Sequence, residues 1–203
     1  EVVVKIELFK NGPLKQNCYL VSSSRGETIV IDPGSDAPGI FRTLARLSLE
    51  PLAIICTHGH FDHIGAAGEL QSQFRIPFYL NKGDHDLMRR ANLYALVFKS
   101  REHIKIPEEC NDLIDGEVLE IARMRLTVFT TPGHTSGSIC ISIGDLLFTG
   151  DTIVRAKPGR FDLPGGNQTI LENSIRSLVN KVPVEAMCYP GHGDPFEISS
   201  LQF

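Results

Sequence analysis

Residues 58 to 63 read His58-Gly59-His60-Phe61-Asp62-His63, which places three imidazoles and one carboxylate within six positions. Imidazole and carboxylate are ligands that suit zinc, iron and manganese. The stretch follows a β-rich apolar run over 52–56 and precedes a helix-like run over 64–74. It is therefore predicted to be a tight metal-binding turn between a strand and a helix, a place where binding residues often lie.

The spacing within this stretch indicates how many metal ions it could bind. His58 and His60 are separated by one residue, so on extended backbone their side chains point the same way and can bind one ion. Gly59 between them has no Cβ and tolerates unusual backbone angles. Asp62 and His63 are adjacent, and we expect them to face a second ion. The alternative is a polar surface loop with Asp62 as a helix cap, but histidine clusters at ligand spacing more often bind metal.

The composition is that of a soluble globular protein and predicts a single domain over residues 1–203. The chain is 42% hydrophobic and 22% charged, with 20 basic residues, 24 acidic residues and a formal net charge of −4. It has no block of Lys and Arg and no apolar run near the roughly 18 residues of a membrane span, so we expect neither a nucleic-acid nor a membrane partner. We expect a cytoplasmic protein. Because the chain begins at Glu1 without Met, a targeting peptide removed from a precursor is the alternative. The sequence does not indicate an oligomeric state.

The chain has five cysteines, Cys18, Cys56, Cys110, Cys140 and Cys188. Their number is odd and none forms a Cys-x-x-Cys pair, so we expect free, buried thiols in a reducing compartment. A catalytic cysteine is the alternative, and it is disfavoured because no cysteine is expected beside a spare histidine outside the metal-ligand pattern.

Apolar periodicity predicts two groups of strands, each followed by helices. Strands are predicted over 2–9, 18–22, 28–31, 52–56, 78–80, 118–121, 125–130, 138–143, 146–149 and 186–189. Helices are predicted over 38–49, 64–74, 84–98 and 168–181. The triplet Asp84-His85-Asp86 is expected to cap the third of these helices, with a metal site as the alternative. This order indicates two β-rich sheets packed together, with helices on the outside.

Three more polar residues follow strand-like runs, each directly after a glycine. They are His134 in Thr131-Pro132-Gly133-His134-Thr135, Asp151 in Phe148-Thr149-Gly150-Asp151-Thr152 and His192 in Tyr189-Pro190-Gly191-His192-Gly193. Small, turn-forming residues let the chain bend sharply, so that the next side chain points into a common cleft. Five of the seven histidines thereby belong to one pattern, and only His85 and His103 remain outside it.

In this order, and over nearly the whole chain, these segments resemble the metallo-β-lactamase-fold hydrolases. The matching motifs are His-x-His-x-Asp-His, Pro-Gly-His-Thr, Gly-Asp-Thr and Pro-Gly-His-Gly. The resemblance implies an α/β fold, a four-layer αβ/βα sandwich of two mixed β-sheets with helices on the outer faces, and a cleft for two metal ions at the sheet edges. It assigns one ion to His58, His60 and His134, the other to Asp62, His63 and His192, the bridge between them to Asp151, and the acidic residue behind the site to Asp32.

Within this superfamily the sequence is most similar to glyoxalase II (hydroxyacylglutathione hydrolase), particularly its short relatives. The shared segments are Asn17-Cys18-Tyr19-Leu20, Gly150-Asp151-Thr152 and Gly159-Arg160-Phe161-Asp162. Lactam-hydrolysing zinc enzymes of the commonest type have Cys in place of Asp151, flavodiiron proteins have Glu in place of His60, and RNA-processing members carry extra domains or basic surfaces. The chain ends soon after His192, so we expect no C-terminal glutathione-binding helical domain.

Arg160 and Asp162 depart from glyoxalase II, which has a Lys and a Tyr at these positions. Arg160 is expected to bind a substrate carboxylate, because the planar guanidinium suits that group. Asp162 would then orient Arg160. The alternative is an ordinary salt bridge within a loop, since exposed ion pairs are common and weak.

The favoured hypothesis is hydrolysis of a small-molecule thioester, such as an acyl-glutathione, by hydroxide held between two divalent ions. Zinc is expected first, with iron or manganese as the alternatives. Asp62 would also orient the hydroxide, and a thiolate with a pKa near ~8.5 leaves without a strong general acid. The main alternative is oxidation of glutathione persulfide by oxygen at one iron bound by His58 (or His60), His134 and Asp151, since persulfide dioxygenases of this fold also have Gly-Arg-x-Asp. A non-catalytic metal-binding module is the third hypothesis; it would predict eroded ligands, and none is missing.

Overall fold

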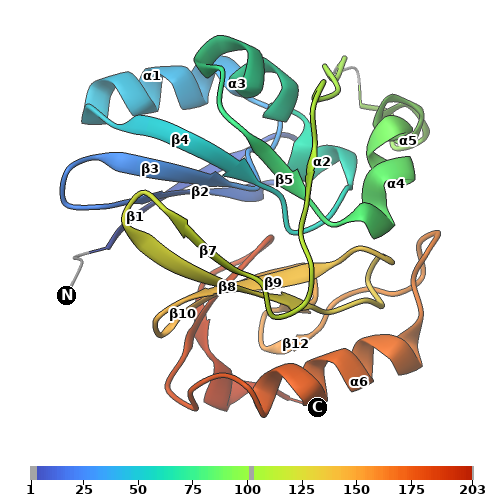
Figure 1. The fold of residues 1–203 in the computed structure, drawn as a ribbon. Helices are drawn as coiled ribbons and strands as arrows, with labels where there is room; N and C mark the ends of the chain where they lie inside the picture. The colour runs from blue at the N-terminus through green and yellow to red at the C-terminus, as the bar shows by residue number, and fades with distance from the viewer. Residues whose placement is uncertain (1–3, 101–102, 203) are drawn as a thin grey trace.

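Two six-stranded β-sheets pack face to face in the computed structural model, which describes residues 4–100 and 103–202 (Figure 1). The first sheet has its strands in the order β1 (Lys5–Asn11), β2 (Gln16–Ser22), β3 (Glu27–Ile31), β4 (Glu50–Ile55), β5 (Phe78–Leu80) and β6 (Asn111–Asp112). The second has the order β14 (Phe196–Glu197), β13 (Met187–Pro190), β10 (Leu146–Gly150), β9 (Ile139–Ile143), β8 (Met124–Thr130) and β7 (Val118–Ile121). Each sheet contains parallel and antiparallel pairs, and β11 (Ile153–Val154) pairs with β12 (Lys157–Pro158) in a separate ribbon.

Helices cover the outer faces of both sheets. In Figure 1, α1 (Ala37–Leu47) and α3 (Ala67–Phe74) lie over the first sheet, and α6 (Gln168–Val179) lies under the second. The shorter elements are α2 (Phe61–Ile64), α4 (His85–Arg89), α5 (Ala91–Val97) and the 3₁₀ turns η1 (Lys82–Asp84) and η2 (Ile198–Ser200). The expected four-layer sandwich of two mixed sheets with outer helices is confirmed.

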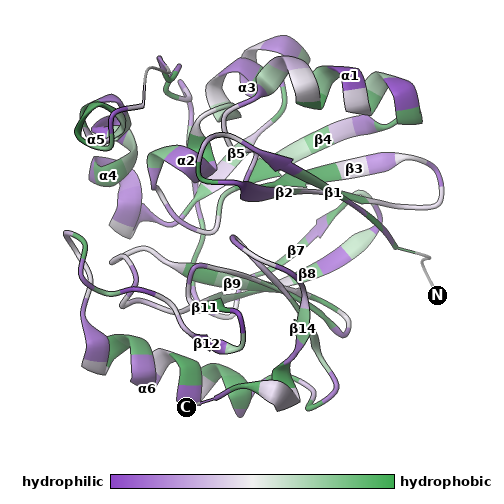
Figure 2. Ribbon diagram, turned by 180° about the vertical axis from the view of Figure 1, so that it is seen from behind, coloured by the Kyte–Doolittle hydropathy of each residue, from purple (hydrophilic) through white to green (hydrophobic). Residues whose placement is uncertain are grey.

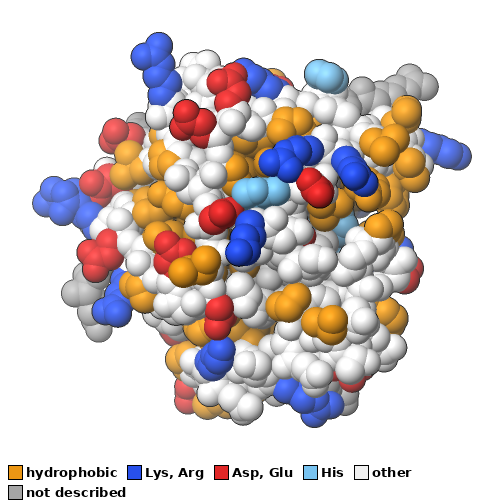
Figure 3. Space-filling view, turned by 45° about the vertical axis from the view of Figure 1, so that its right-hand side comes forward, with side chains coloured by type: hydrophobic (Ala, Val, Ile, Leu, Met, Phe, Trp, Pro, Cys, Tyr) orange, Lys and Arg blue, Asp and Glu red, His pale blue; other side chains and the backbone are white. Residues whose placement is uncertain are grey.

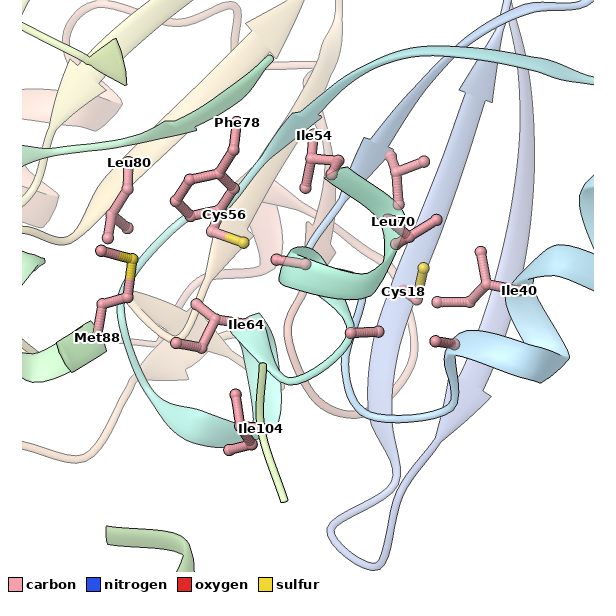
Figure 4. Close-up of a cluster of buried hydrophobic side chains, with 14 of the residues drawn as sticks. Cys18, Ile40, Ile54, Cys56, Ile64, Leu70, Phe78, Leu80, Met88 and Ile104 are labelled. Atoms are coloured by element: carbon pink, nitrogen blue, oxygen red, sulfur yellow. The ribbon is translucent and has the colours of Figure 1, made fainter. Parts of the chain in front are cut away.

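The inner strands, such as β2 and β3, are buried along nearly their whole length because each sheet is covered on both sides, whereas the edge strands β1 and β7 consist largely of exposed and partly buried residues. Along β2, Cys18 and Leu20 face the helices α1 and α3, while Tyr19 and Val21 face the second sheet. Figure 4 shows the helix-side layer, in which side chains from β2, β4, β5, α1 and α3 point toward one another. A third cluster of buried hydrophobic side chains lies between the second sheet and α6. Hydrophobic and hydrophilic residues alternate along this helix, as expected of a helix with one buried face (Figure 2).

Two predicted helices are interrupted in the structure. The helix predicted over 64–74 is divided into α2 and α3, because Gly65 lies against the backbone carbonyl of Gly34 and Ala66 N–H donates a hydrogen bond to that carbonyl. The helix predicted over 84–98 is divided into α4 and α5 at Arg90, whose φ of −95° and ψ of 8° are not helical. A tertiary contact at Gly65 and a local backbone turn at Arg90 thus interrupt the helices, although the apolar periodicity that predicts a helix continues through both positions.

Several strand predictions also need adjustment. The strand predicted over 2–9 begins at Lys5, and residues 2 and 3 lie outside the described residues. The strands β6, β11, β12 and β14 have two residues each, which is too short for an alternating pattern to reveal. Within the described part of the chain, no helix has the length and apolar character needed to cross a membrane.

Phe148 offers a test of the layer between the two sheets. Its ring is fully buried and lies 5.4 Å from the ring of Tyr19 and 5.2 Å from that of Tyr189, measured between centroids. We expect Phe148→Ala to lower the free energy of unfolding by about 3–5 kcal/mol through loss of burial and formation of a cavity. Val184→Ala, at an exposed position, should change it by less than about 0.5 kcal/mol. Denaturant unfolding measures both, and equal effects would contradict this role for Phe148.

Candidate metal centre

Strand directions bring the predicted ligands to one edge of the sandwich. In the second sheet, β8 and β10 are each antiparallel to β9, and β10 is parallel to β13. The strands β8, β10 and β13 therefore run the same way, and the residues that follow their carboxyl ends, His134, Asp151 and His192, emerge at the same edge. His58 and His60 follow the end of β4 in the first sheet. The ligands thus come from both sheets and meet between them.

His58, His60 and His134 form a first ligand group. Nε2 of His134 lies 3.3 Å from Nε2 of His58 and 3.0 Å from Nδ1 of His60. A tetrahedral zinc ion with Zn–N distances of about 2.0–2.1 Å holds its nitrogens about 3.3 Å apart. All three residues are buried, and the three nitrogens have the spacing of one ion's ligands.

Asp62, His63 and His192 form a second ligand group. Oδ2 of Asp62 lies 3.3 Å from Nε2 of His192 and 3.7 Å from Nε2 of His63. Nε2 of His63 is buried and has no hydrogen-bond partner among the described residues. A buried polar atom without a partner is costly, and a cation bound between these side chains would remove that cost.

Asp151 lies between the two groups. Its Oδ2 is 3.7 Å from Nε2 of His134 in the first group and 3.6 Å from Nε2 of His192 in the second. Its Oδ1 is 3.7 Å from Nε2 of His63 and is also buried without a hydrogen bond to any described residue. Gly191 packs directly against Asp151 and His63, where a Cβ would overlap both side chains. The structure therefore brings all seven sequence-predicted ligands together, with Asp151 at the position of a bridge.

Asp32 orients one histidine of each group. Its Oδ2 accepts hydrogen bonds from Nδ1–H of His63 at 3.0 Å and from Oγ1–H of Thr57 at 2.7 Å. Nδ1–H of His58 donates in turn to Oγ1 of Thr57, at 3.0 Å. These bonds place the protons on Nδ1, which leaves both Nε2 lone pairs directed into the centre. The prediction that Asp32 lies behind the site agrees with this geometry.

The two ligand groups differ in electrostatics. Burial and neighbouring histidines lower the pKa of His58 well below its ordinary value, and burial lowers the pKa of His60 to about 3. Both imidazoles are therefore neutral at pH 7, with lone pairs free to bind a cation. Burial would also lower the pKa of His63, but the surrounding carboxylates, Asp62 first, raise it to about 10. The second group thus favours positive charge, which a metal ion supplies in place of the proton.

Asp84 connects the loops that carry the first ligand group. Its Oδ2 accepts hydrogen bonds from Gly59 N–H at 2.8 Å and Thr135 Oγ1–H at 2.7 Å, and its Oδ1 accepts from Gly137 N–H at 2.7 Å. The predicted triplet does lie at the start of α4, with Asp84 at the N-cap position and Asp86 in the first turn, but the Asp84 side chain makes no capping bond to the helix. Both of its oxygens are used by loop donors, so the alternative metal-site prediction has no support. A buried loop clamp and a helix cap look the same in sequence.

Asn17 and Tyr19 hold the loop of His192. Nδ2–H of Asn17 donates to the carbonyl of Pro190 at 2.9 Å and to that of Gly193 at 2.7 Å. Oη–H of Tyr19 donates to the carbonyl of Pro190 at 2.6 Å. These bonds give a physical role to the Asn-Cys-Tyr segment, for which the sequence indicated only a resemblance.

The metal centre opens into a cleft of about 270 Å³. Its walls include five ligands together with Leu14, Phe61, Leu87, Tyr94, Phe98, Arg160, Leu163 and Pro164. Arg160 donates from Nε and Nη2 to the two carboxylate oxygens of Asp162, at 2.8 Å and 3.0 Å. Its backbone carbonyl accepts a hydrogen bond from Nδ1–H of His134 at 2.7 Å. Arg160 therefore both forms the loop salt bridge and lines the cleft.

The cysteines agree with their prediction in part. All five are free, and all except Cys110 are buried. The expectation that no cysteine lies beside a spare histidine is wrong, because Sγ of Cys110 is 3.3 Å from Nε2 of His85. Burial, with the nearby charge of Asp112, raises the pKa of the Cys110 thiol to about 11. The thiol is therefore protonated at pH 7, which makes it a poor nucleophile.

Sequence comparisons match the chain to one family over most of its length. The family model described as "Metallo-beta-lactamase superfamily" matches residues 11–192. The chain is 33% identical to the "Probable metallo-hydrolase YqgX" of Bacillus subtilis (strain 168), over 94% of this chain and 91% of that protein. It is 27% identical to the "Hydroxyacylglutathione hydrolase GloC" of Haemophilus influenzae, over 94% of this chain and 91% of that protein.

Solved structures show the same fold. The "di-iron-bound form" of TTHA1623 matches with a TM-score of 0.88 and 32% identity, over 96% of each chain. The "BLEG-1 B3 metallo-beta-lactamase" matches with a TM-score of 0.83 and 32% identity, over 97% of this chain and 95% of that one. ETHE1 from Myxococcus xanthus, at 23% identity and a TM-score of 0.78 over 96% of this chain and 80% of that one, shares the fold alone.

The hydrogen bonds of Asp32 predict how its loss affects metal binding. We expect Asp32→Asn to weaken metal binding at both ligand groups by about 10–100-fold, because His58 and His63 both lose their orientation. Asn suits the backbone there, where φ is +49°. Thr57→Val should weaken only the first ligand group, and Thr57→Ser, which keeps the hydroxyl, neither. Chelator competition measures each affinity; unchanged binding in Asp32→Asn would contradict this role.

The clamp formed by Asp84 predicts a loss of stability. Asp84→Asn replaces an acceptor by an amide whose N–H groups face backbone N–H donors, so we expect the free energy of unfolding to fall by about 2 kcal/mol. For a chain of this size, that corresponds to a fall in Tm of about 4–8 °C. Asp86→Asn is the matched control, since Asp86 is exposed and its ion pair is with Arg89, three residues away on the helix surface. A thermal unfolding curve for each variant decides the matter, and similar curves would refute the clamp.

Proposed function

The chain belongs to the metallo-beta-lactamase superfamily, and from this premise we propose that it is a metal-dependent hydrolase that cleaves a thioester such as an acyl-glutathione. The observation that carries the proposal is the meeting of two complete ligand groups and Asp151, five of whose seven residues line one cleft. A full set of ligands that opens on a cleft favours catalysis over a metal-binding module without activity. The similarity to a hydroxyacylglutathione hydrolase supports the choice of a thioester.

We propose that the two ligand groups bind two divalent ions, zinc first, with iron or manganese as the alternatives, since His and Asp suit all three. The nitrogen spacing of the first group and the two buried atoms without partners, His63 Nε2 and Asp151 Oδ1, fit such ions. The di-iron form of a protein 32% identical to this chain supports two ions in this fold. When bound, such ions lower the pKa of a water from 15.7 toward ~7 and polarise a carbonyl.

Asp62 is the residue that we assign to the attacking water. It lines the cleft, and although burial would raise its pKa, His63 and His192 hold that pKa well below the usual range. Asp62 is therefore ionised and can accept a hydrogen bond from the water, which aims the oxygen at the acyl carbon. A C–O bond then forms and the C–S bond breaks, with its electron pair leaving on sulfur. A thiolate with a pKa near ~8.5 leaves without a strong general acid, and the water's protons pass to the thiolate and to solvent.

Arg160 is the residue that we assign to substrate binding. Asp162 occupies Nε and Nη2 of the guanidinium, which leaves Nη1 for a substrate anion in the cleft. The bidentate pair limits the freedom of a side chain that is otherwise half exposed. A carboxylate on the substrate would add a hydrogen bond to the unused donor.

Oxidation of a persulfide at one iron is the second candidate, and the observation that favours it is the Arg160–Asp162 pair at the cleft. His58, His134 and Asp151 would hold the iron as two histidines and one carboxylate. Against it, the second ligand group is as fully assembled as the first, with Asp151 within 3.7 Å of histidine nitrogens from both. One iron per chain together with oxygen uptake on glutathione persulfide would favour the oxygenase. Two ions per chain without oxygen uptake would favour the hydrolase.

A direct assay tests the hydrolase. We expect the purified protein, reloaded separately with zinc, iron or manganese, to hydrolyse lactoylglutathione. Asp62→Asn should lower kcat by about 10²–10⁴-fold, since the water loses its orienting acceptor. Glu69→Gln, an exposed acidic residue on α3, is the control and should leave kcat unchanged. A β-lactam assayed in parallel tests the activity for which the similar BLEG-1 metallo-beta-lactamase is named. If lactoylglutathione and other acyl thioesters stay intact with every metal, the proposal fails.

A further inference from the structure

The cleft is largely apolar outside its metal ligands. Its remaining wall consists of Leu14, Phe61, Leu87, Tyr94, Phe98, Leu163 and Pro164, with Arg160 as the one charged side chain among the described lining residues. Apolar walls stabilise the apolar part of a ligand, whereas buried polar groups on a ligand need partners that these walls do not offer.

The apolar wall begins at the ligands and continues outward. Phe61 stands between the ligands His60 and Asp62, and its ring lies 5.6 Å from that of Phe98, measured between centroids. Leu87 on α4 and Tyr94 on α5 continue the wall. Exposed hydrophobic side chains extend from there over α5, where they gather at the right of Figure 3. An apolar chain joined to the reacting carbon would therefore remain in apolar contact as it leaves the centre.

A second, charged groove lies on the other side of His192. It has a volume of about 600 Å³ and is lined by Lys10, Leu14, Lys15, Arg155, His192, Gly193 and Asp194. Leu14 and His192 line both the groove and the cleft, so the two meet at a metal ligand. Lys10 pairs with Asp194 at 3.0 Å. Among the described residues, no carboxylate lies within 4 Å of Lys15 or Arg155, so the groove has an excess of positive charge.

From these two surfaces we propose that the substrate is a thioester of an apolar acyl group with an anionic thiol carrier. The acyl group lies in the cleft against Leu87 and Phe98, one carboxylate of the carrier binds Arg160 at the cleft, and the other anionic groups of the carrier lie in the groove against Lys15 and Arg155. The scissile C–S bond then lies where cleft and groove meet. This inference rests on the proposed thioester hydrolysis and specifies its substrate class. A lactoyl group, with three carbons and a hydroxyl, would leave most of the apolar wall without contact.

The length of the acyl chain tests the cleft. With glutathione as the constant carrier, we expect kcat/KM to rise by about fourfold per added methylene from acetyl through butanoyl to hexanoyl, until the cleft is full. Hexanoylglutathione should exceed lactoylglutathione. A flat series, or a preference for lactoyl, would overturn the inference while leaving thioester hydrolysis in place. Hydrolysis of none of these esters with any metal would overturn the proposed function itself.

Paired variants separate the cleft from general effects on folding. Phe98→Ser and Leu87→Ser should each reduce the rise of kcat/KM with acyl chain length, from about fourfold per methylene to less than about twofold. Ile170→Ser is the control, because Ile170 is exposed on α6, not on α5, and does not line the cleft. We expect its chain-length series to match that of the unaltered protein. If Phe98→Ser and Leu87→Ser keep the full dependence, the acyl group does not bind where we place it.

The carrier tests the groove. Hexanoylglutathione should be hydrolysed with a kcat/KM about tenfold above that of the neutral hexanoyl-N-acetylcysteamine at low ionic strength, and salt should reduce the difference. Lys15→Gln and Arg155→Gln should raise KM for the glutathione ester alone, whereas Lys157→Gln, which lies outside the groove, should not. Equal rates for the two esters, or equal effects of the variants on both, would overturn the carrier half of the inference.

Discussion

The carboxylate of Asp32 is the constraint on which the metal centre depends. It is buried, and an ionised carboxylate is stable there only while donors surround it. Those donors are the N–H and hydroxyl of Thr57 and the imidazole of His63, and the Thr57 hydroxyl accepts in turn from His58. One buried charge therefore sets the tautomers of a histidine in each ligand group. Because Asp32 directly follows β3 and Thr57 lies just beyond β4, the pairing of two strands in one sheet positions the ligands of both groups.

The remaining ligands are held by buried polar side chains that never touch the centre. Asp84 joins the loop after β4 to the loop after β8, and Asn17 joins β2 to the loop after β13. The bonds of Asp84 to Thr135 and Gly137, and both bonds of Asn17, cross between the two halves of the chain. The centre therefore forms only when the two sheets have packed together. Their packing positions the loops that carry the ligands. Because these bonds fix the loops, the side chains of the two ligand groups stay within a few ångströms of one another.

Chemistry and selectivity are assigned to different parts of the protein. The residues that we propose to bind metal and activate water lie on turns at the ends of strands, where the backbone is fixed by the sheets. The surfaces that would recognise a substrate lie on α4, α5 and the loops around Leu14 and Arg155, which are attached to the sandwich at its edge. These segments can change in sequence without disturbing the sheets, so one hydrolytic centre can serve different acyl groups and carriers.

The sequence by itself identified the candidate ligands and the layers. Each candidate ligand lies in a short motif, such as Gly133-His134, and continuous apolar runs along strands such as β2 indicate sheets covered on both faces. These signals are local, so they survive without a structure. Tertiary structure alone decided the break at Gly65, the contact of Cys110 with His85, and the use of Asp84 as a clamp instead of a helix cap. It also decided the apolar character of the cleft. In each case the contacting residue is distant in the chain, so the residues next to a position in the sequence do not reveal the contact.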